Sequence, residues 1–177
     1  MGYYLLNEQD QVYLEKWWKW LDQNRGDRAQ LRRANSPDDI LLSPPFFHFL
    51  QQMPDKWSNG NDIPLSDAAM VAAVLAHVRS ISDTPFAKAL ATHREGGSTP
   101  IMSELRFQQL QKSQYPDEFF RRLCRAIAML KGKASITDLA ESVLLWLREH
   151  RTSPARKPER RLAVRWATDY YSALKNQ

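Results

Sequence analysis

Hydrophobic residues recur every three or four positions along most of the chain, which is the spacing of one face of an α-helix. The pattern is clearest over residues 116–133, where one side of the expected helix carries Phe120, Leu123, Cys124, Ile127 and Leu130. The opposite arc carries Arg121, Arg122 and Arg125. Pro116 suits a first helical turn and Gly132 suits a helix end. This segment is therefore predicted to be a helix with one packing face and one positive face.

Similar spacing predicts helices along the rest of the chain. They are expected at residues 8–24, 27–34, 46–53, 66–80, 85–93, 104–113, 136–150 and 158–174, with a short turn of helix at 38–42. Helix starts are expected at Asn7 with Asp10 as a capping box, at Ser66 or Asp67, at Ser103, and at Ser135 or Thr137. No stretch alternates with period two, so the predicted fold class is all-α.

The chain of 177 residues is long enough for one domain or for two small helical lobes. Residues 94–100, REGGSTP, read as a flexible connector. We therefore predict a two-lobed helical bundle of about eight or nine helices, with residues 1–97 as the N-terminal lobe and residues 98–177 as the C-terminal lobe with a basic surface.

Charge is distributed unevenly within a net charge of +5. Residues 1–118 carry 12 Lys and Arg against 15 Asp and Glu, whereas residues 119–177 carry 13 against 5. Cations concentrated in one third of a chain are typical of a surface that binds phosphates. The longest apolar run, residues 68–76, is too short to cross a bilayer, and the first residues lack a secretory signal. A soluble cytoplasmic protein without a membrane partner is expected.

Basic residues that fall outside the packing faces are the candidate nucleic-acid contacts, and we expect them to form one continuous track. They are Arg28, Arg32, Arg33, Arg106, Arg121, Arg122, Arg125, Lys131, Lys133, Arg156, Lys157, Arg160, Arg161 and Arg165. Lys157, Arg161 and Arg165 are expected as a row along the last helix, where like charges repel unless an anion lies beside them. The alternative is a solvated face, with local ion pairs from Asp117 to Arg121 and from Glu118 to Arg122.

Residues that carry catalysis or hold metals are not grouped in the sequence. The four histidines, His48, His77, His93 and His150, are dispersed, and the lone Cys124 has no partner cysteine. No phosphate-binding glycine loop and no nucleophile elbow are present. We expect no metal site, no cofactor and no enzymatic activity, although a nuclease site built from distant acids stays open.

Three motifs in combination resemble a known family. They are RAQLRRA at residues 28–34 after a tryptophan-rich helix, MSELRF at 102–107, and FRRLCRAIAMLKGK at 120–133. Together they resemble the CasB family, the small subunit of the type I-E CRISPR surveillance complex, Cascade. The likeness covers most of the chain and is weakest over residues 53–100 and at the last residues. Leu105 departs from the pattern, because a polar or basic residue is expected there in many relatives.

The resemblance implies a helical, two-lobed, non-enzymatic subunit for antiviral defence. Such subunits pair along the guide RNA, contact the large and backbone subunits, and help hold the target and displaced DNA strands of the R-loop. The basic residues carried over by motif are Arg32, Arg33, Arg106, Arg121, Arg122 and Arg125; the segment with Arg156, Lys157, Arg160, Arg161 and Arg165 matches less closely. Two alternatives stay open: a helical DNA-binding regulator, and an assembly scaffold whose basic surface meets acidic protein.

Overall fold

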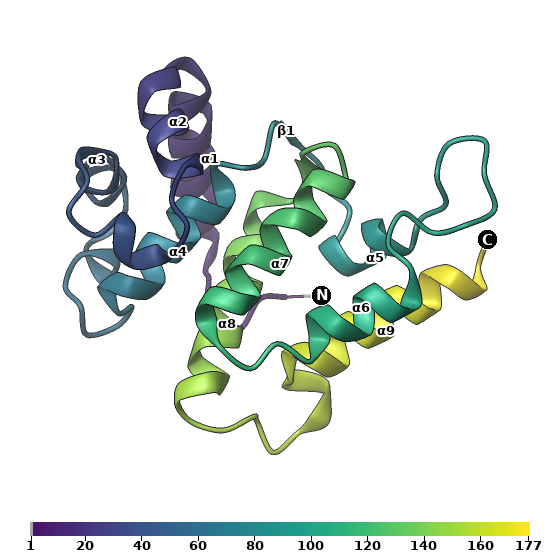
Figure 1. The fold of residues 1–177 in the computed structure, drawn as a ribbon. Helices are drawn as coiled ribbons and strands as arrows, with labels where there is room; N and C mark the ends of the chain where they lie inside the picture. Colours follow the sequence, from purple (N-terminus) through teal and green to yellow (C-terminus); the bar gives the residue numbers. More distant parts are fainter. Residues whose placement is uncertain (1) are drawn as a thin grey trace.

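The computed structural model describes residues 2–177, which fold almost entirely into helices (Figure 1). Their α-helices are α1 (Glu8–Gln23), α2 (Arg25–Arg32), α3 (Pro44–Gln52), α4 (Leu65–Leu75), α5 (Phe86–Ala91), α6 (Glu104–Gln111), α7 (Pro116–Met129), α8 (Ile136–Arg151) and α9 (Leu162–Lys175). Short 3₁₀ helices are η1 (Pro37–Asp39), η2 (Asp55–Trp57) and η3 (Pro158–Arg160). The predicted all-α class is confirmed.

One strand pair was not expected from the sequence. Strand β1 (Ser80–Ile81) lies parallel to β2 (Lys133–Ala134), with Ser80 opposite Lys133. A two-residue strand is too short to show a period of two, so the hydrophobic pattern could not indicate it. The pair joins the end of α4 to the turn after α7.

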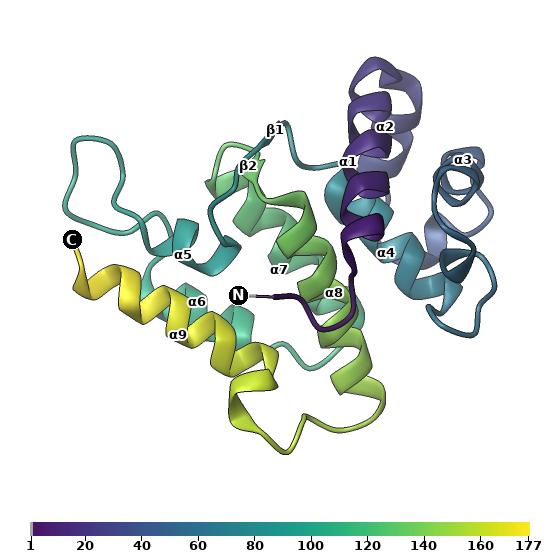
Figure 2. The same cartoon turned by 180° about the vertical axis from the view of Figure 1, so that it is seen from behind.

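The helices form two groups joined by a central pair (Figure 1). Helices α1 to α4 lie at one end, α5, α6 and α9 lie at the other, and α7 and α8 run between them, as the view from behind also shows (Figure 2). Helix α4 packs against α8, and α5 packs against α9. Buried side chains from both groups belong to one continuous hydrophobic cluster. Because α5 precedes residue 97 and α9 follows it, packing crosses the boundary expected there, and that boundary stays a prediction.

Several helix starts follow the predicted capping chemistry. The Asn7 side chain accepts a hydrogen bond from the Asp10 N–H at 2.8 Å, and the Asp10 carboxylate accepts one from the Asn7 N–H at 3.0 Å. Ser103 caps α6 and Ser135 caps α8. These contacts satisfy N–H groups that have no partner inside the helix.

The start of α4 differs from the prediction. The helix begins at Leu65, directly after Pro64, so neither Ser66 nor Asp67 is its cap. Asp67 is buried instead and accepts hydrogen bonds from both terminal nitrogens of Arg151, each at 2.8 Å. A planar guanidinium suits this two-point contact, which joins the start of α4 to the end of α8.

The end of α4 also differs, because the helix stops at Leu75 rather than near Ser80. Arg28 donates to the carbonyls of Ala76, at 3.3 Å, and Val78, and the Trp18 indole N–H also donates to Val78, at 3.2 Å. Side chains of α1 and α2 therefore satisfy carbonyls that the helix leaves without partners. The chain can then leave the helix and reach β1.

Two further boundaries are corrected. Helix α2 begins at Arg25 rather than Asp27 and includes Gly26. Helix α9 begins at Leu162 rather than Pro158, because Arg161 has an extended backbone with ψ of 135° and separates η3 from α9. None of the helices in residues 2–177 is both long and apolar enough to span a bilayer.

Candidate nucleic-acid interface

Helix α7 has the two faces that its sequence predicts. Phe120, Leu123 and Ile127 are buried, and Arg121 and Arg125 are exposed. The packing face is wider than expected because it also contains Phe119, whose ring stacks on Trp146 of α8 with centroids 4.4 Å apart. That contact fixes α7 against α8 and turns its arginines outward.

The turn after α7 brings Lys131 near Arg79, and both side chains line one cavity. Lys131 and Gly132 both have left-handed backbones, with φ of 56° and 78°. The Gly132 carbonyl accepts hydrogen bonds from the N–H groups of Arg79, at 2.8 Å, and Ser80, at 3.2 Å. A side chain at position 132 would lie 2.8 Å from Cγ of Arg79, so glycine lets the Arg79 side chain pass over the turn.

A cavity of about 310 Å³ lies between this turn and α2. Arg32, Arg79 and Lys131 line it, together with His77 and Cys124. Burial, with Arg32 and Arg28 nearby, lowers the pKa of His77 to about 4, so the ring is neutral at physiological pH. Its Nε2 atom is buried without a hydrogen-bond partner. Burial also raises the pKa of the Cys124 thiol to about 12, which makes it a poor nucleophile.

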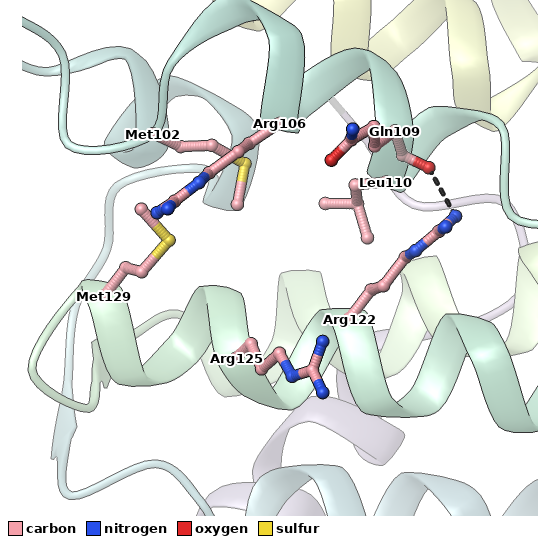
Figure 3. A pocket seen from close by; sticks show the side chains of 7 residues that line it. All are labelled: Met102, Arg106, Gln109, Leu110, Arg122, Arg125 and Met129. Atoms are coloured by element: carbon pink, nitrogen blue, oxygen red, sulfur yellow. Dashed lines mark hydrogen bonds between the residues drawn. The ribbon is translucent and has the colours of Figure 1, made fainter.

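A second cavity, of about 330 Å³, lies between α6 and α7 (Figure 3). Arg106 reaches it from α6, and Arg122 and Arg125 reach it from α7. The remaining lining is formed mainly by apolar side chains, those of Met102, Leu110 and Met129. Cations therefore surround an apolar floor.

Arg122 differs from its neighbours because its guanidinium already has protein partners. It pairs with Glu118 at 2.6 Å and donates to the Gln109 carbonyl at 2.7 Å, the contact drawn in Figure 3. The ion pair predicted between Glu118 and Arg122 is thus confirmed. The one expected between Asp117 and Arg121 is not formed, which leaves Arg121 open to solvent.

Six exposed cations flank the outward face of α7 and are here called the basic ridge: Arg32, Arg79, Arg106, Arg121, Arg125 and Lys131. Across residues 2–177, none of these side chains makes an ion pair or a hydrogen bond. Arg79 was not a sequence candidate, because it was assigned to the end of an apolar helix. The shortened α4 and the glycine turn bring it to the ridge.

Other candidates on α2 and β2 differ in availability. Arg33 and Lys133 are exposed. Arg28 pairs with Asp22 at 2.9 Å, besides its two carbonyl contacts, and its side chain is 16 % exposed. Arg28 and Arg32 lie four residues apart on α2, where like charges repel, and Asp22 with the two carbonyls offsets that repulsion without any external anion.

The basic segment before α9 does not form the predicted row. Only Arg165 lies within α9, because Lys157 and Arg161 flank η3 before α9 begins. Arg161 donates to the carbonyls of Ala155, at 2.7 Å, and Arg156, at 3.2 Å. Arg156, Lys157 and Arg160 are exposed.

The candidates therefore form two groups rather than one continuous track. Arg160 and Arg165 lie 5.4 and 5.0 Å from the ring centre of Tyr4 in the N-terminal segment. That segment is on the near side in Figure 2, whereas α7 is on the near side in Figure 1. Phe119 of α7 and the N-terminal segment both contact α8, which lies between the two groups.

Comparison with family models matches residues 27–171 to CRISPR-associated protein Cse2. The chain belongs to this family. The resemblance to the CasB small subunit of type I-E Cascade is thereby confirmed. Comparison with curated proteins and with solved structures gives no match.

Membership in the Cse2 family identifies the chain as a Cascade subunit, with other Cascade subunits as its partners. The family is a structural component of that complex and not a known enzyme. Every residue of the basic ridge lies inside the matched range, whereas the N-terminal segment with Tyr4 lies outside it.

Proposed function

We propose that the basic ridge binds nucleic-acid phosphates without reading base sequence, and that it helps to hold the strands of the R-loop in Cascade. The observation that carries this proposal is the placement of six exposed, unpaired cations on α7 and on the segments that flank it in the described chain. Arginine binds phosphate oxygens through a planar set of donors and stays charged at all physiological pH values.

The energetics of strand exchange suit a weak, sequence-independent contact. The guide RNA–DNA duplex is about as stable as the DNA duplex that it replaces, so modest backbone contacts can shift the balance. In this proposal the chain works in the cytoplasm beside guide RNA and target DNA, next to the large and backbone subunits and a second copy of itself. Phosphate contacts accept any target sequence, which such a complex requires.

The test replaces Arg106, Arg121 and Arg125 by Ala, here called the ridge variant. Its matched control replaces Lys16, Lys88 and Lys175, three exposed lysines outside the ridge, by Ala. Both variants lose three charges, so a difference between them reports position rather than net charge. We expect the ridge variant to keep its helix content and melting temperature, and to weaken single-stranded DNA binding at low salt and R-loop formation by assembled Cascade.

Salt dependence makes the test quantitative. Each phosphate contact on single-stranded DNA contributes about 0.7 to the slope of log affinity against log salt. The ridge variant should therefore lower the slope by about 2, and the control should leave it unchanged. A ridge variant that binds DNA normally but no longer joins the complex would instead indicate a scaffold whose cations meet acidic protein. Strong preference for one sequence would favour a regulator.

A further inference from the structure

A third cavity, of about 490 Å³, lies where the N-terminal segment crosses the end of α8. Its walls combine aromatic, apolar and cationic side chains: Tyr3, Tyr4, Leu5, Leu145, Arg148 and Arg160. It is here called the Tyr4 cavity. The N-terminal segment that contributes to it lies in front of α8 in Figure 2, whereas α7 with its part of the basic ridge lies in front in Figure 1.

A buried carboxylate holds the N-terminal segment in place. Glu141 of α8 is fully buried, and its two oxygens accept hydrogen bonds from three consecutive backbone N–H groups, those of Tyr4, Leu5 and Leu6, at 2.7 to 3.2 Å. Hydrogen bonds to a buried charge are among the stronger ones in proteins. The backbone that carries Tyr4 is therefore held in place, although the residue is 42 % exposed.

The cations of the cavity are available for an external anion. Arg148 and Arg160 are exposed, and their side chains form no ion pair or hydrogen bond within the described chain. Glu149 is the one carboxylate in the lining; it accepts the Leu162 N–H at 3.0 Å, and burial raises its pKa. Arg165 lies over the Tyr4 ring outside the cavity lining, and its Nη1 atom is buried without a hydrogen-bond partner.

We propose that the Tyr4 cavity is a second nucleic-acid site, which takes a nucleotide of a single strand separate from the strand on the basic ridge. Arg148 and Arg160 bind the phosphate, and Tyr3 and Tyr4 pack against the sugar and base. Aromatic rings beside a positive groove are the recurring means of holding single strands without sequence preference. The lining contains no Asn or Gln in the described residues, so it offers no amide to read a base edge.

One observation supports a nucleotide rather than an acidic peptide as the ligand. Another supports a site that is separate from the basic ridge. Carboxylate side chains would use the guanidinium groups but gain little from the tyrosine rings and the apolar Leu5 and Leu145. The lining comes from the N-terminal segment, from α8 and from residues 152–160, none of which contributes a residue to the basic ridge. The inference rests on the proposed function, because both require that the chain binds nucleic acid. It adds a site for a second strand.

The experiment counts binding sites with a fluorescent oligothymidylate too short to reach both faces, at low salt. We expect two oligonucleotides on the full-length protein and one on the ridge variant. Adding Arg148→Ala and Arg160→Ala to the ridge variant should weaken the remaining binding by at least about tenfold. Tyr4→Phe should preserve binding, because the ring remains, and Tyr4→Leu should weaken it by about tenfold.

Circular dichroism checks the fold of each variant. If Tyr4→Leu unfolds the N-terminal segment, Arg148→Ala alone tests the site, because Arg148 is exposed on α8. One bound oligonucleotide, lost completely in the ridge variant, would overturn the second site and leave the proposed function intact. Two sites unchanged by the ridge variant would overturn the ridge alone. No binding to any variant would overturn both proposals. Arg148-dependent binding of oligoglutamate, without binding of oligothymidylate, would overturn the nucleotide assignment.

Discussion

Helix α7 and the segment before α9 both carry closely spaced cations, but the structure uses the two sets differently. On α7, Arg121 and Arg125 are exposed and have no protein partner in residues 2–177. Before α9, Arg161 donates to two carbonyls of its own loop, and within α9 Arg165 lies over the Tyr4 ring. A guanidinium whose donors are already used has fewer left for an external phosphate. Spacing locates the cations, and packing decides which remain available.

Helix α2 shows the same contrast within two turns. Arg28 is tied to Asp22 and to the carbonyls at the end of α4, whereas Arg32 is exposed and lines the cavity beside Lys131. The first arginine therefore stabilises the fold and the second belongs to the basic ridge. Substitutions that separate stability from binding can test this division.

The largest effect is expected for Arg28→Ala compared with Arg125→Ala. Removing Arg28 leaves the Ala76 carbonyl and the Asp22 carboxylate without this donor and the Val78 carbonyl with Trp18 alone, which should lower the free energy of unfolding by about 2 kcal/mol. Removing Arg125, an exposed side chain, should change it by less than about 0.5 kcal/mol. Urea denaturation at equilibrium measures both.

Arg28→Lys is the control for this pair, because lysine keeps the charge but cannot reach all three partners with a rigid planar group. It should fall between wild type and Arg28→Ala. Equal loss of stability from Arg28→Ala and Arg125→Ala would show that the two positions do not differ as proposed.

Much of the fold could be predicted from the sequence because its signals are local. The Asn7–Asp10 capping box and the faces of α7 each depend on residues within a few turns of one helix, and periodicity reports those directly. The arginines of α7 were found for the same reason. Local charge spacing also identified the Glu118–Arg122 pair.

What the sequence missed depends on contacts between distant segments. The end of α4 is set by Arg28 and Trp18, about 50 to 60 residues away, and it is this early end that brings Arg79 beside Lys131. The aromatic wall of Tyr4 depends on Glu141, more than 130 residues along the chain. The error at Arg161 has another cause, since one extended residue interrupts the helical period that the row required.

An intermediate effect is expected from pH at His77, which lies between Arg28 and the ridge. Its pKa is about 4 in the folded chain against 6.5 for the free side chain, so the folded state binds fewer protons between these values. The contribution of His77 is therefore present above pH 6.5 and lost as pH falls toward 4. Relative to His77→Gln, the wild-type melting temperature should drop by several degrees across this range, with the partial exposure of the ring reducing the effect of the shift.

The comparison with His77→Gln is needed because protonation of other groups stabilises the folded state as the pH falls. Burial raises the pKa values of Asp138, Glu149 and Asp169, so their protonation at low pH favours the folded state. Those carboxylates are common to both proteins and cancel in the difference. NMR titration adds a second arm, because Arg32→Ala removes a nearby cation and should raise the pKa of His77. If Arg32→Ala leaves the pKa of His77 unchanged, the Arg32 charge does not act on the His77 ring.

The smallest effect is expected from Glu118→Gln, which asks whether an engaged arginine can be returned to the ridge. The Glu118–Arg122 pair is partly exposed and contributes at most about 0.5 kcal/mol to stability, so its loss should hardly change the melting temperature. Arg122 then keeps its contact to the Gln109 carbonyl but has donors free for a phosphate. Affinity for single-stranded DNA should rise by less than about threefold, and its salt slope should steepen by up to about 0.7.

Asp117→Asn is the matched control, because Asp117 lies in the same helical turn, loses the same charge and is not paired with an arginine. If removing either carboxylate increases DNA affinity equally, the gain reflects net charge alone and Arg122 has not joined the ridge. If only Glu118→Gln steepens the salt slope, one local ion pair is what separates Arg122 from Arg121 and Arg125. Helix α7 and the segment before α9 would then differ in whether packing supplies each guanidinium with a protein partner.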